Sequence, residues 1–159
     1  MRNSPIQGRG AFALEDIPRG TRLIEYTGEK ISHDEADRRY DDEKMKRHHT
    51  FLFTLTDNWI IDAANGGNEA MYINHSCDPN CEAVIVGDKR IYIESKKRIP
   101  AGTELVYDYQ YERRDDHTAE DEEFYRCLCG SPKCRGSILM PKKAKRSSSK
   151  KRAGKKSRA

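Results

Sequence analysis

The sequence predicts a mainly β fold, in which turns separate short strands. Runs rich in β-branched and aromatic residues, which favour strands, recur along the chain. They lie at 21–27, 51–55, 59–61, 82–86, 90–95 and 104–111. Asp57-Asn58 falls in a turn between two of them, and Gly87-Asp88 is typical of a two-residue hairpin turn. The 159 residues allow a single domain, with a core large enough to fold unaided.

The stretch 2–13 is expected to end in a short apolar strand. Within it, Gly8 and Gly10 flank Arg9. Glycines at this spacing let a backbone approach a ligand closely, although a Gly-x-Gly pair alone is more often only a turn.

One segment, from about residue 33 to 47, is predicted to be a helix. Ser32 and Glu35 match the capping-box pattern that marks a helix start. The apolar face is thin and consists of Ala36, Tyr40 and Met45. We therefore expect a peripheral, solvated helix.

The stretch 72–81, YINHSCDPNC, is predicted to be a functional site. It sets a carboxamide, an imidazole, a hydroxyl and a thiol side by side at 74–77, and Asp78-Pro79 then forces a turn. Asn and His side chains offer both donors and acceptors, and a thiolate can bind metal. Taken alone, the same residues also suit an Asn/Asp-rich surface loop.

The last strand run, 104–111, carries a stripe of large side chains at alternate positions. The stripe consists of Leu105, Tyr107, Tyr109 and Tyr111. An aromatic stripe with a period of two most often belongs to a core or to a sheet surface.

Five cysteines are present, and three of them crowd together as Cys127, Cys129 and Cys134. The N-terminus has no apolar segment like that of a signal peptide, and no run of 18 apolar residues occurs, so we expect a soluble intracellular protein without membrane contact. In a reducing compartment such a cluster indicates a metal site rather than disulfides, which remain the rival interpretation. Three thiolates leave a tetrahedral zinc ion one ligand short.

Charge divides the chain into an acidic body and a basic end. Ten of the 30 Lys and Arg residues lie from Lys142 onward, where there is no acid. That leaves 20 basic against 26 acidic residues in 1–141, a net charge of about −6. The basic end is expected to be disordered, either as a solvated segment or as a non-specific contact to DNA through 142–159.

Five motifs together resemble those of SET-domain lysine methyltransferases with a post-SET zinc segment, especially the trithorax-like branch. In the family's order, they occupy 7–10, 25–29, 74–81, 104–109 and 127–136. The resemblance implies a SET-domain (β-clip) fold of small curved sheets, with a pseudoknot in which the later chain threads the Asn-His-Ser-Cys segment. It predicts four parts: a SET domain at 1–111, a mobile acidic connector at 112–123, a post-SET zinc segment at 124–140 and the basic tail at 141–159.

The resemblance also implies S-adenosylmethionine as methyl donor and Zn²⁺ as a structural metal. Zinc would be bound by Cys77, Cys127, Cys129 and Cys134, with Cys81 left as a buried spare thiol. Cofactor contacts would come from Gly8, Arg9, Gly10, Asn74, His75, Tyr109 and Leu128. The cofactor positions Met71 and Phe51 depart from the pattern, since relatives often have Arg and Tyr there, and both departures bear on cofactor affinity rather than on the fold.

In the family the methyl group passes directly to a neutral lysine amine. Tyr109 matches the catalytic tyrosine, and Tyr26 matches an aromatic residue of the lysine channel, where ring faces tolerate a cation. Tyr107 occupies a position that carries Phe or Tyr, and a hydroxyl there leaves less room for added methyl groups, which predicts mainly monomethylation. The sequence supplies no obvious base, so the amine is expected to lose its proton to water, while alignment lowers most of the barrier.

The implied substrate is a lysine of a basic protein, such as a histone or histone-like tail, and the chain's own tail has that composition. One alternative is a catalytically idle binder of lysine peptides or cofactor, tethered to nucleic acid by the tail. Another is a zinc-stabilised nucleic-acid binder. The expected location is the nucleus and chromatin in a eukaryote, or the cytoplasm, the nucleoid or secretion as an effector in a bacterium.

Overall fold

The structure is a computed structural model and describes residues 1–46 and 48–143. Short strands dominate, so the mainly β prediction is confirmed. The strands are β1 (Arg2–Asn3), β2 (Arg9–Gly10), β3 (Arg22–Glu25), β4 (Glu29–Ser32), β5 (Leu52–Thr54), β6 (Trp59–Asp62), β7 (Asn74–His75), β8 (Cys81–Val86), β9 (Arg90–Ser95) and β10 (Val106–Tyr107). The helices are α1 (His33–Arg39) and α2 (Ala119–Phe124), with the 3₁₀ turns η1 (Asp42–Lys44) and η2 (Glu69–Tyr72).

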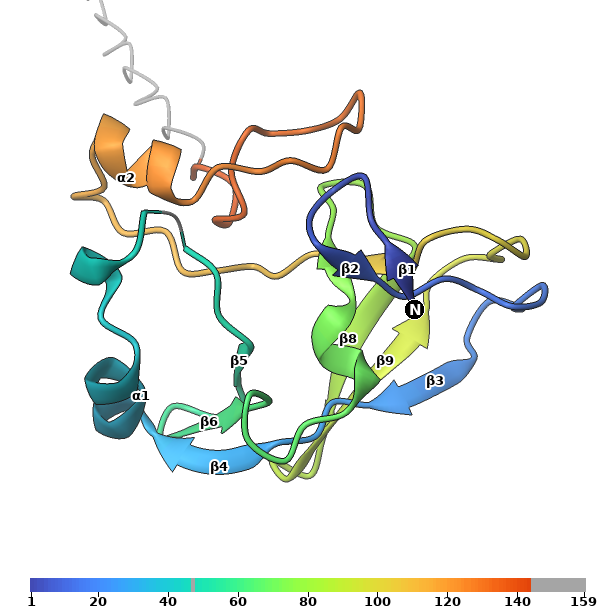
Figure 1. Ribbon diagram of the computed structural model, residues 1–159, viewed down its shortest axis with the longest axis horizontal. Helices are drawn as coiled ribbons and strands as arrows, with labels where there is room; N and C mark the ends of the chain where they lie inside the picture. Colours follow the sequence, from blue (N-terminus) through green and yellow to red (C-terminus); the bar gives the residue numbers. More distant parts are fainter. Residues whose placement is uncertain (47, 144–159) are drawn as a thin grey trace, which may run out of the picture.

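The strands form small separate sheets rather than one large one (Figure 1). Two antiparallel sheets have three strands each, in the orders β3-β9-β8 and β4-β6-β5. Along β9, Ile91, Ile93 and Ser95 are buried while the residues between them are more exposed, as a strand with one face on the core requires. Ile91 and Ile93 enter the main hydrophobic core together with Tyr26, Ile73 and Tyr107.

The hairpin between β8 and β9 forms where it was expected, but its turn is longer. Val86 pairs with Arg90, so three residues rather than two make the turn. Gly87 and Asp88 have φ values of 58° and 51°. Both therefore adopt the left-handed conformation that Gly and Asp tolerate best, and the chain reverses one residue later than a two-residue turn would allow.

The helix after Ser32 starts as predicted and ends early. The Ser32 hydroxyl accepts a hydrogen bond from the N–H of Glu35 at 3.2 Å, but α1 stops at Arg39. Tyr40 leaves the helix, and its hydroxyl donates to the carboxylate of the fully buried Asp62 at 2.9 Å. A buried carboxylate needs hydrogen-bond partners, and Tyr40 joins Arg39, Ala64 and Asn65 in supplying them. Arg47, the last residue of the predicted helix, lies outside the described residues.

A second helix, α2, was not predicted, because the sequence analysis assigned 112–123 to a mobile connector. Thr118 caps it: the side chains of Thr118 and Asp121 each accept a hydrogen bond from the other residue's backbone N–H. Arg113 also pairs with Glu122 from the segment before the helix. These polar contacts hold a six-residue helix that has no buried residue, so apolar periodicity gave no sign of it.

The late chain joins the central stretch through β10, which runs parallel to β7. Val106 pairs with Asn74 and Tyr107 with His75. The amide of Asn80 extends this contact, donating to the carbonyl of Glu104 at 2.8 Å and accepting from the N–H of Val106 at 2.9 Å. The predicted strand over 104–111 therefore shrinks to two residues, because its backbone bonds to side chains and loops instead of a long partner strand.

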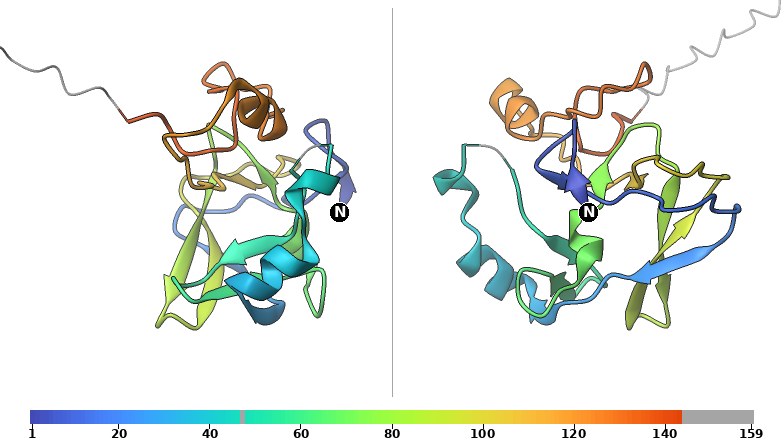
Figure 2. Two further views of the ribbon diagram at one scale, coloured as in Figure 1. Left: turned by 90° about the vertical axis from the view of Figure 1, so that its left-hand side faces the viewer. Right: turned by 45° about the vertical axis from the view of Figure 1, so that its right-hand side comes forward.

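The segment from α2 to residue 143 lies along one end of the molecule, at the opposite end from the β4-β6-β5 sheet (Figures 1 and 2). Leu139 bridges to Tyr111, and the N–H of Met140 donates to the carbonyl of Tyr111 at 2.8 Å. These contacts fix the cysteine-containing segment to the end of the tyrosine stripe. None of the helices in the described part of the chain is long and apolar enough to span a membrane.

Candidate active site and metal centre

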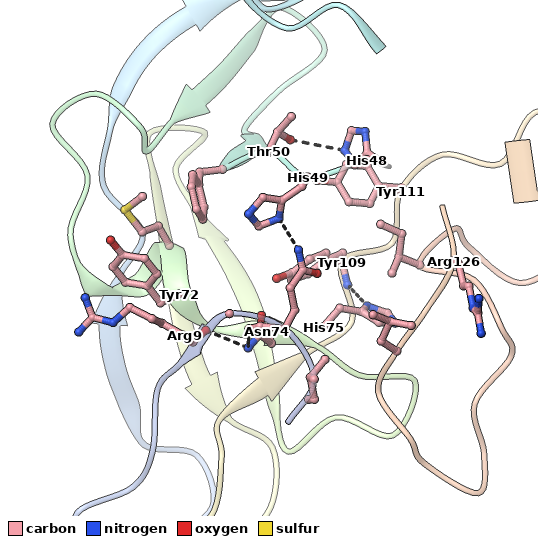
Figure 3. A pocket seen from close by; sticks show the side chains of 17 residues that line it. Arg9, His48, His49, Thr50, Tyr72, Asn74, His75, Tyr109, Tyr111 and Arg126 are labelled. Carbon is pink, nitrogen blue, oxygen red and sulfur yellow. Dashed lines mark hydrogen bonds between the residues drawn. The ribbon is translucent and has the colours of Figure 1, made fainter. Parts of the chain in front are cut away.

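Two cavities meet at a common wall that contains Tyr109. The first lies among the N-terminal glycine segment, the central stretch and the cysteine segment (Figure 3). The second lies beside β5 and the tyrosine stripe. Both are lined by His48, Thr50, Met71, Tyr109 and Tyr111.

Most residues that the sequence assigned to cofactor binding line the first cavity. They are Gly8, Arg9, Phe51, Met71, Asn74, His75, Tyr109 and Leu128. Gly10 does not line it but is buried beside Glu104. Gly10 therefore shapes the cavity wall through packing rather than by facing the cavity.

Asn74 fixes the N-terminal segment in place as a wall of the first cavity. Its side-chain N–H groups lie 3.2 Å from the carbonyl of Gln7 and 3.1 Å from that of Arg9. The same nitrogen lies 2.9 Å from Oε1 of Glu104. The Asn74 amide therefore orients backbone that is 65 residues away in sequence.

His75 lies between the tyrosine stripe and the cysteine cluster. Its Nδ1 is 3.1 Å from the backbone nitrogen of Tyr109, and its Nε2 is 3.4 Å from the sulfur of Cys77. Burial lowers the pKa of His75 to about 4, with the nearby Asp108 opposing this shift and Arg135 adding to it. The imidazole is therefore neutral at physiological pH.

The second cavity has an aromatic wall that includes all three tyrosines assigned to catalysis. Tyr26, Tyr107 and Tyr109 line it together with Phe53. Ring centroids are 5.3 Å apart for Tyr26 and Phe53, 6.0 Å for Phe53 and Tyr107, and 4.9 Å for Tyr107 and Tyr109. Such rings suit an aliphatic side chain that ends in a cation.

The hydroxyls of this wall remain protonated. Burial raises the pKa values of Tyr26, Tyr107 and Tyr109 far above the ordinary range, and neighbouring tyrosines add to the effect. Tyr109 donates to the carbonyl of Ile73, and Tyr26 to that of Phe51, both at 2.9 Å. Each hydroxyl oxygen can still accept a hydrogen bond from a guest amine.

Four cysteines gather into one cluster, as the resemblance implied. The sulfur atoms of Cys77, Cys127, Cys129 and Cys134 all lie within 4.8 Å of one another, and those of Cys77 and Cys127 are 3.7 Å apart. Tetrahedral zinc with bonds of about 2.3 Å would hold its sulfur ligands roughly 3.8 Å apart, so the donor set and spacing fit zinc. All five cysteines of the chain are free, and Cys81 is buried in the main core away from the cluster.

The proton affinities of the cluster differ from one thiol to another. Burial raises the pKa values of Cys77 and Cys127. Burial also pushes the pKa of Cys129 upward, but backbone N–H groups near it outweigh this and lower the pKa to about 7. Metal binding to this cluster would therefore displace protons from the first two thiols.

A salt bridge ties the cysteine segment to the tyrosine stripe. The guanidinium of Arg135 contacts both carboxylate oxygens of Asp108, at 2.9 and 2.7 Å, and its Nε donates to the carbonyl of Leu139 at 2.8 Å. Asp108 stands between Tyr107 and Tyr109. The position of Tyr107 and Tyr109 is thus linked to the residue that follows Cys134.

Sequence reasoning missed several residues of the first cavity. His48, His49 and Thr50 line it, as does Arg126 from the segment before Cys127. His48 packs against Tyr111 and Tyr125, with ring centroids 4.7 and 4.9 Å away. The adjacent histidines just before the predicted strand were the available signal, because imidazole rings can both donate and accept hydrogen bonds.

Comparisons with known proteins cover most of the chain. Residues 8–110 match the family described as SET domain. The chain is 43% identical over 136 residues to the "Histone-lysine N-methyltransferase, H3 lysine-4 specific" of Mycosarcoma maydis, with 83% of this chain and 9% of that protein covered. A Saccharomyces cerevisiae protein of the same name is 41% identical over 138 residues, covering 84% and 12%.

A further relative is the "Histone-lysine N-methyltransferase trithorax" of Drosophila virilis. It is 41% identical over 138 residues, with 83% of this chain and 3% of that protein covered. The chain therefore spans only a small part of the length of these curated relatives.

Proposed function

We propose, because this chain belongs to the SET-domain family, that it transfers a methyl group from S-adenosylmethionine to a lysine side chain of a basic protein. The observation that carries the proposal is the pair of cavities that share Tyr109. One cavity can take a small-molecule donor and the other a long side chain, and the shared wall is where two such guests can react. Relatives named as histone-lysine methyltransferases support the same chemistry.

The residues of the first cavity fit a cofactor of this kind. Aromatic and apolar groups, such as Phe51 and Leu128, lie beside backbone polar groups near Gly8 and the amide of Asn74. Small-molecule sites usually combine an apolar lining with a few fixed polar groups. S-adenosylmethionine bound there would supply a methyl group on a positively charged sulfur.

The tyrosines of the second cavity would hold and align the amine. The rings of Tyr26 and Tyr107 would enclose the methylene chain, and burial among them disfavours the charged amine, which promotes loss of its proton. The hydroxyl oxygen of Tyr109, fixed by its bond to the Ile73 carbonyl, would accept a hydrogen bond from the amine. Alignment of this kind can lower a barrier substantially without any covalent step on the protein.

Acidic residues near the second cavity favour a basic substrate. Asp57 and Glu112 line this cavity. The adjacent hollow beside α2 includes Asp42, Glu43 and Asp121. This charge would attract a segment rich in Lys and Arg, such as a histone H3 tail, a histone-like protein or the chain's own basic tail.

The assay is methyl transfer from labelled S-adenosylmethionine to core histones, histone-like proteins and the chain itself. We expect incorporation into at least one of them, and a loss of turnover of about 100-fold in Tyr109→Phe, because the fixed hydroxyl that aligns the amine is gone. Tyr92→Phe, which alters a tyrosine outside both cavities, is the matched control and should keep full turnover.

Several outcomes would oppose the proposal. Binding of cofactor and lysine peptide without any methyl transfer would identify an idle binder instead. Equal turnover of Tyr109→Phe and Tyr92→Phe would remove Tyr109 from the reaction. An unmodified tail, found by mass spectrometry after incubation with cofactor, would exclude the chain as its own substrate.

Association with chromatin in a nucleus, or with the nucleoid in a bacterium, follows from this substrate class. Ten Lys and Arg residues from Lys142 onward would add a non-specific attraction to DNA. Of this tail, residues 144–159 lie outside the described part of the chain. Lys142 lies inside it, and its ammonium is 3.5 Å from the carboxylate of Glu122.

A further inference from the structure

We infer that His75 is a positioning residue that joins the tyrosine stripe to the cysteine cluster through one fixed tautomer. Its bare Nδ1 accepts from the backbone N–H of Tyr109, and its protonated Nε2 donates to the sulfur of Cys77. The arrangement of these two bonds stands on geometry alone. Only its effect on turnover rests on the proposed function.

The backbone of Tyr109 determines which ring nitrogen carries the proton. A backbone N–H can only donate, and the Tyr109 nitrogen is 3.1 Å from Nδ1 of His75 (Figure 3). Nδ1 must therefore be the acceptor, and the proton of the neutral ring must be on Nε2. Nε2 lies 3.4 Å from Sγ of Cys77, which is within reach of a hydrogen bond to sulfur.

The opposite tautomer has a possible partner, but that partner is already engaged. Nδ1 lies 3.6 Å from Oδ1 of Asp108, so a proton there would point toward a carboxylate. Both oxygens of that carboxylate already accept hydrogen bonds from the guanidinium of Arg135. A proton on Nδ1 would also oppose the N–H of Tyr109, whereas the Nε2 tautomer satisfies both nitrogens.

Packing holds the ring in this orientation. Only 4% of His75 is exposed, and its ring stands edge-on to that of Tyr109 at a centroid distance of 5.2 Å. The pairing of Tyr107 with His75 in the β7–β10 ladder fixes the two backbones as well. The hydroxyl of Tyr109 bonds to Ile73, two residues before His75, so both ends of Tyr109 are held by the same segment.

The consequence is a direct mechanical link between metal site and active site. A hydrogen bond from a neighbouring group to a metal ligand commonly orients that ligand and tunes its affinity. Here the same side chain would also set the position of the tyrosine that aligns the amine. Loss of the hydrogen bond to Cys77 should therefore affect mainly zinc retention. Loss of the hydrogen bond from the Tyr109 N–H should affect mainly turnover.

The tautomer can be read directly in the intact 159-residue chain by ¹⁵N-detected NMR of its histidines. We expect His75 to show a protonated Nε2 and a bare Nδ1, with its signals identified by their disappearance in His75→Asn. A proton on Nδ1, or an equal mixture of tautomers, would overturn the inference. His75→Asn serves only to assign the signals, and the measurement requires no catalytic activity.

Two substitutions separate the two bonds. In His75→Asn the amide oxygen can replace Nδ1 but nothing reaches Cys77, so zinc should be released to a chelator about tenfold faster. In His75→Gln the longer side chain can place its N–H near Cys77 but offers no acceptor to Tyr109, so kcat should fall about tenfold with a small change in the peptide KM. Tyr92→Phe, which lies outside both cavities and outside the hollow beside α2, is the control for each assay.

The pattern across the two variants decides between positioning and mere packing. Equal losses of zinc retention and of kcat in His75→Asn and His75→Gln would contradict the inference and indicate a general packing defect. If the wild-type protein methylates none of the substrates tested, the proposed function fails. The NMR result and the zinc release rates would still confirm or refute the two bonds.

Discussion

Tyr107 lies in the wall of the second cavity, between the rings of Phe53 and Tyr109. A hydroxyl at this position leaves less room for added methyl groups than a hydrogen atom would, so we expect mainly monomethylated product. Tyr107→Phe should give di- or trimethylated lysine under conditions in which the wild type gives monomethyl-lysine. Mass spectrometry of a modified peptide measures this, with Tyr92→Phe as control. A Tyr107→Phe protein that yields no higher methylation would refute the assignment.

Gly10 is confined by Glu104 and Ser4. A Cβ atom there would overlap Oε1 of Glu104 and come within 3.0 Å of the Ser4 Cβ. The same oxygen accepts hydrogen bonds from Asn74 and Ser4. Gly10→Ala should therefore lower the free energy of unfolding by about 1–3 kcal/mol, as overpacked sites do, and weaken cofactor binding. Urea denaturation and cofactor titration measure the two effects.

A double variant tests whether the overlap is the cause. Because Glu104→Ala removes the overlapping atoms, its combination with Gly10→Ala should cost less than the two single losses together. If the loss of unfolding free energy in the double variant equals the sum of the losses in the two single variants, Gly10 matters for another reason.

Among single residues, those within recognisable motifs could be predicted and those brought in by tertiary contacts could not. The cysteine cluster and the glycine segment belong to motifs of the family resemblance, and the structure gathers the four cysteines and places Gly8 and Arg9 at the first cavity. Thr50 and Arg126 come from segments with no motif, and only the fold brings them to the same cavity.

At the scale of elements, polar contacts decide where the helices lie. α1 ends where Tyr40 turns toward Asp62, and α2 exists because Thr118 and Asp121 cap it. Neither event leaves a mark in hydrophobic periodicity, which explains why one helix was predicted too long and the other not at all. β9, which has a clear alternating buried pattern, was predicted with its correct bounds.

Acid should weaken the ion pair between Glu122 of α2 and Arg113, which ties the helix to the segment before it. The hydrogen bond from Arg113 is the main reason why the pKa of Glu122 lies below its ordinary value of 4.5. A carboxylate with a lowered folded-state pKa stabilises the fold above its unfolded pKa, and this contribution is lost as the pH falls through the folded value. Glu122→Gln should thus cost about 0.5 kcal/mol at pH 7 and less at pH 3.

Thermal unfolding of the wild type and Glu122→Gln at the two pH values measures this difference. Other titrating groups change the unfolding free energy of both proteins equally in acid. Comparing the two proteins at each pH therefore isolates the contribution of Glu122. Glu120→Gln, at an exposed residue of the same helix, should show little difference at either pH. A Glu122→Gln difference that does not shrink in acid would contradict the role given to the Arg113 contact.

For the whole molecule, the motif resemblance gave the family and the small-sheet architecture correctly, and the comparisons confirm the family. The pairing of strands could not be derived from local patterns. In the β3-β9-β8 sheet, for example, Arg22 pairs with Glu94, and nothing near either residue specifies that partner. Long-range pairing depends on how all the apolar faces fit together, which a residue-by-residue pattern does not contain.

Metal removal is expected to loosen the end of the molecule that closes the first cavity. The wild type should contain one zinc per chain, and Cys134→Ser should lose it, with a lower free energy of unfolding and weaker methyl transfer. Elemental analysis and denaturation measure this, and Cys81→Ala should keep its zinc because Cys81 lies in the core. Purified wild-type protein without zinc, and indifferent to chelators, would contradict the metal assignment.

Truncation before Lys142 tests the role of the basic tail. We expect it to abolish retention on DNA and the steep salt dependence of that retention, since each neutralised phosphate contributes a slope of about −0.9 to log K against log salt. Methyl transfer to a free peptide should be spared. A variant with the tail residues in shuffled order should bind DNA like the wild type, because the attraction is purely electrostatic. Unchanged DNA retention after truncation would assign the contact to the folded body.

The cysteine cluster imposes an order on biosynthesis. Cys77 is synthesised 50 or more residues before the other three cysteines of the cluster. The nascent SET region therefore emerges from the ribosome before they are added. Any ion that this cluster binds with all four sulfurs can enter only after Cys134 has left the exit tunnel. Coordination by all four sulfurs is therefore a late step, which must follow synthesis of the whole stretch from Cys77 to Cys134.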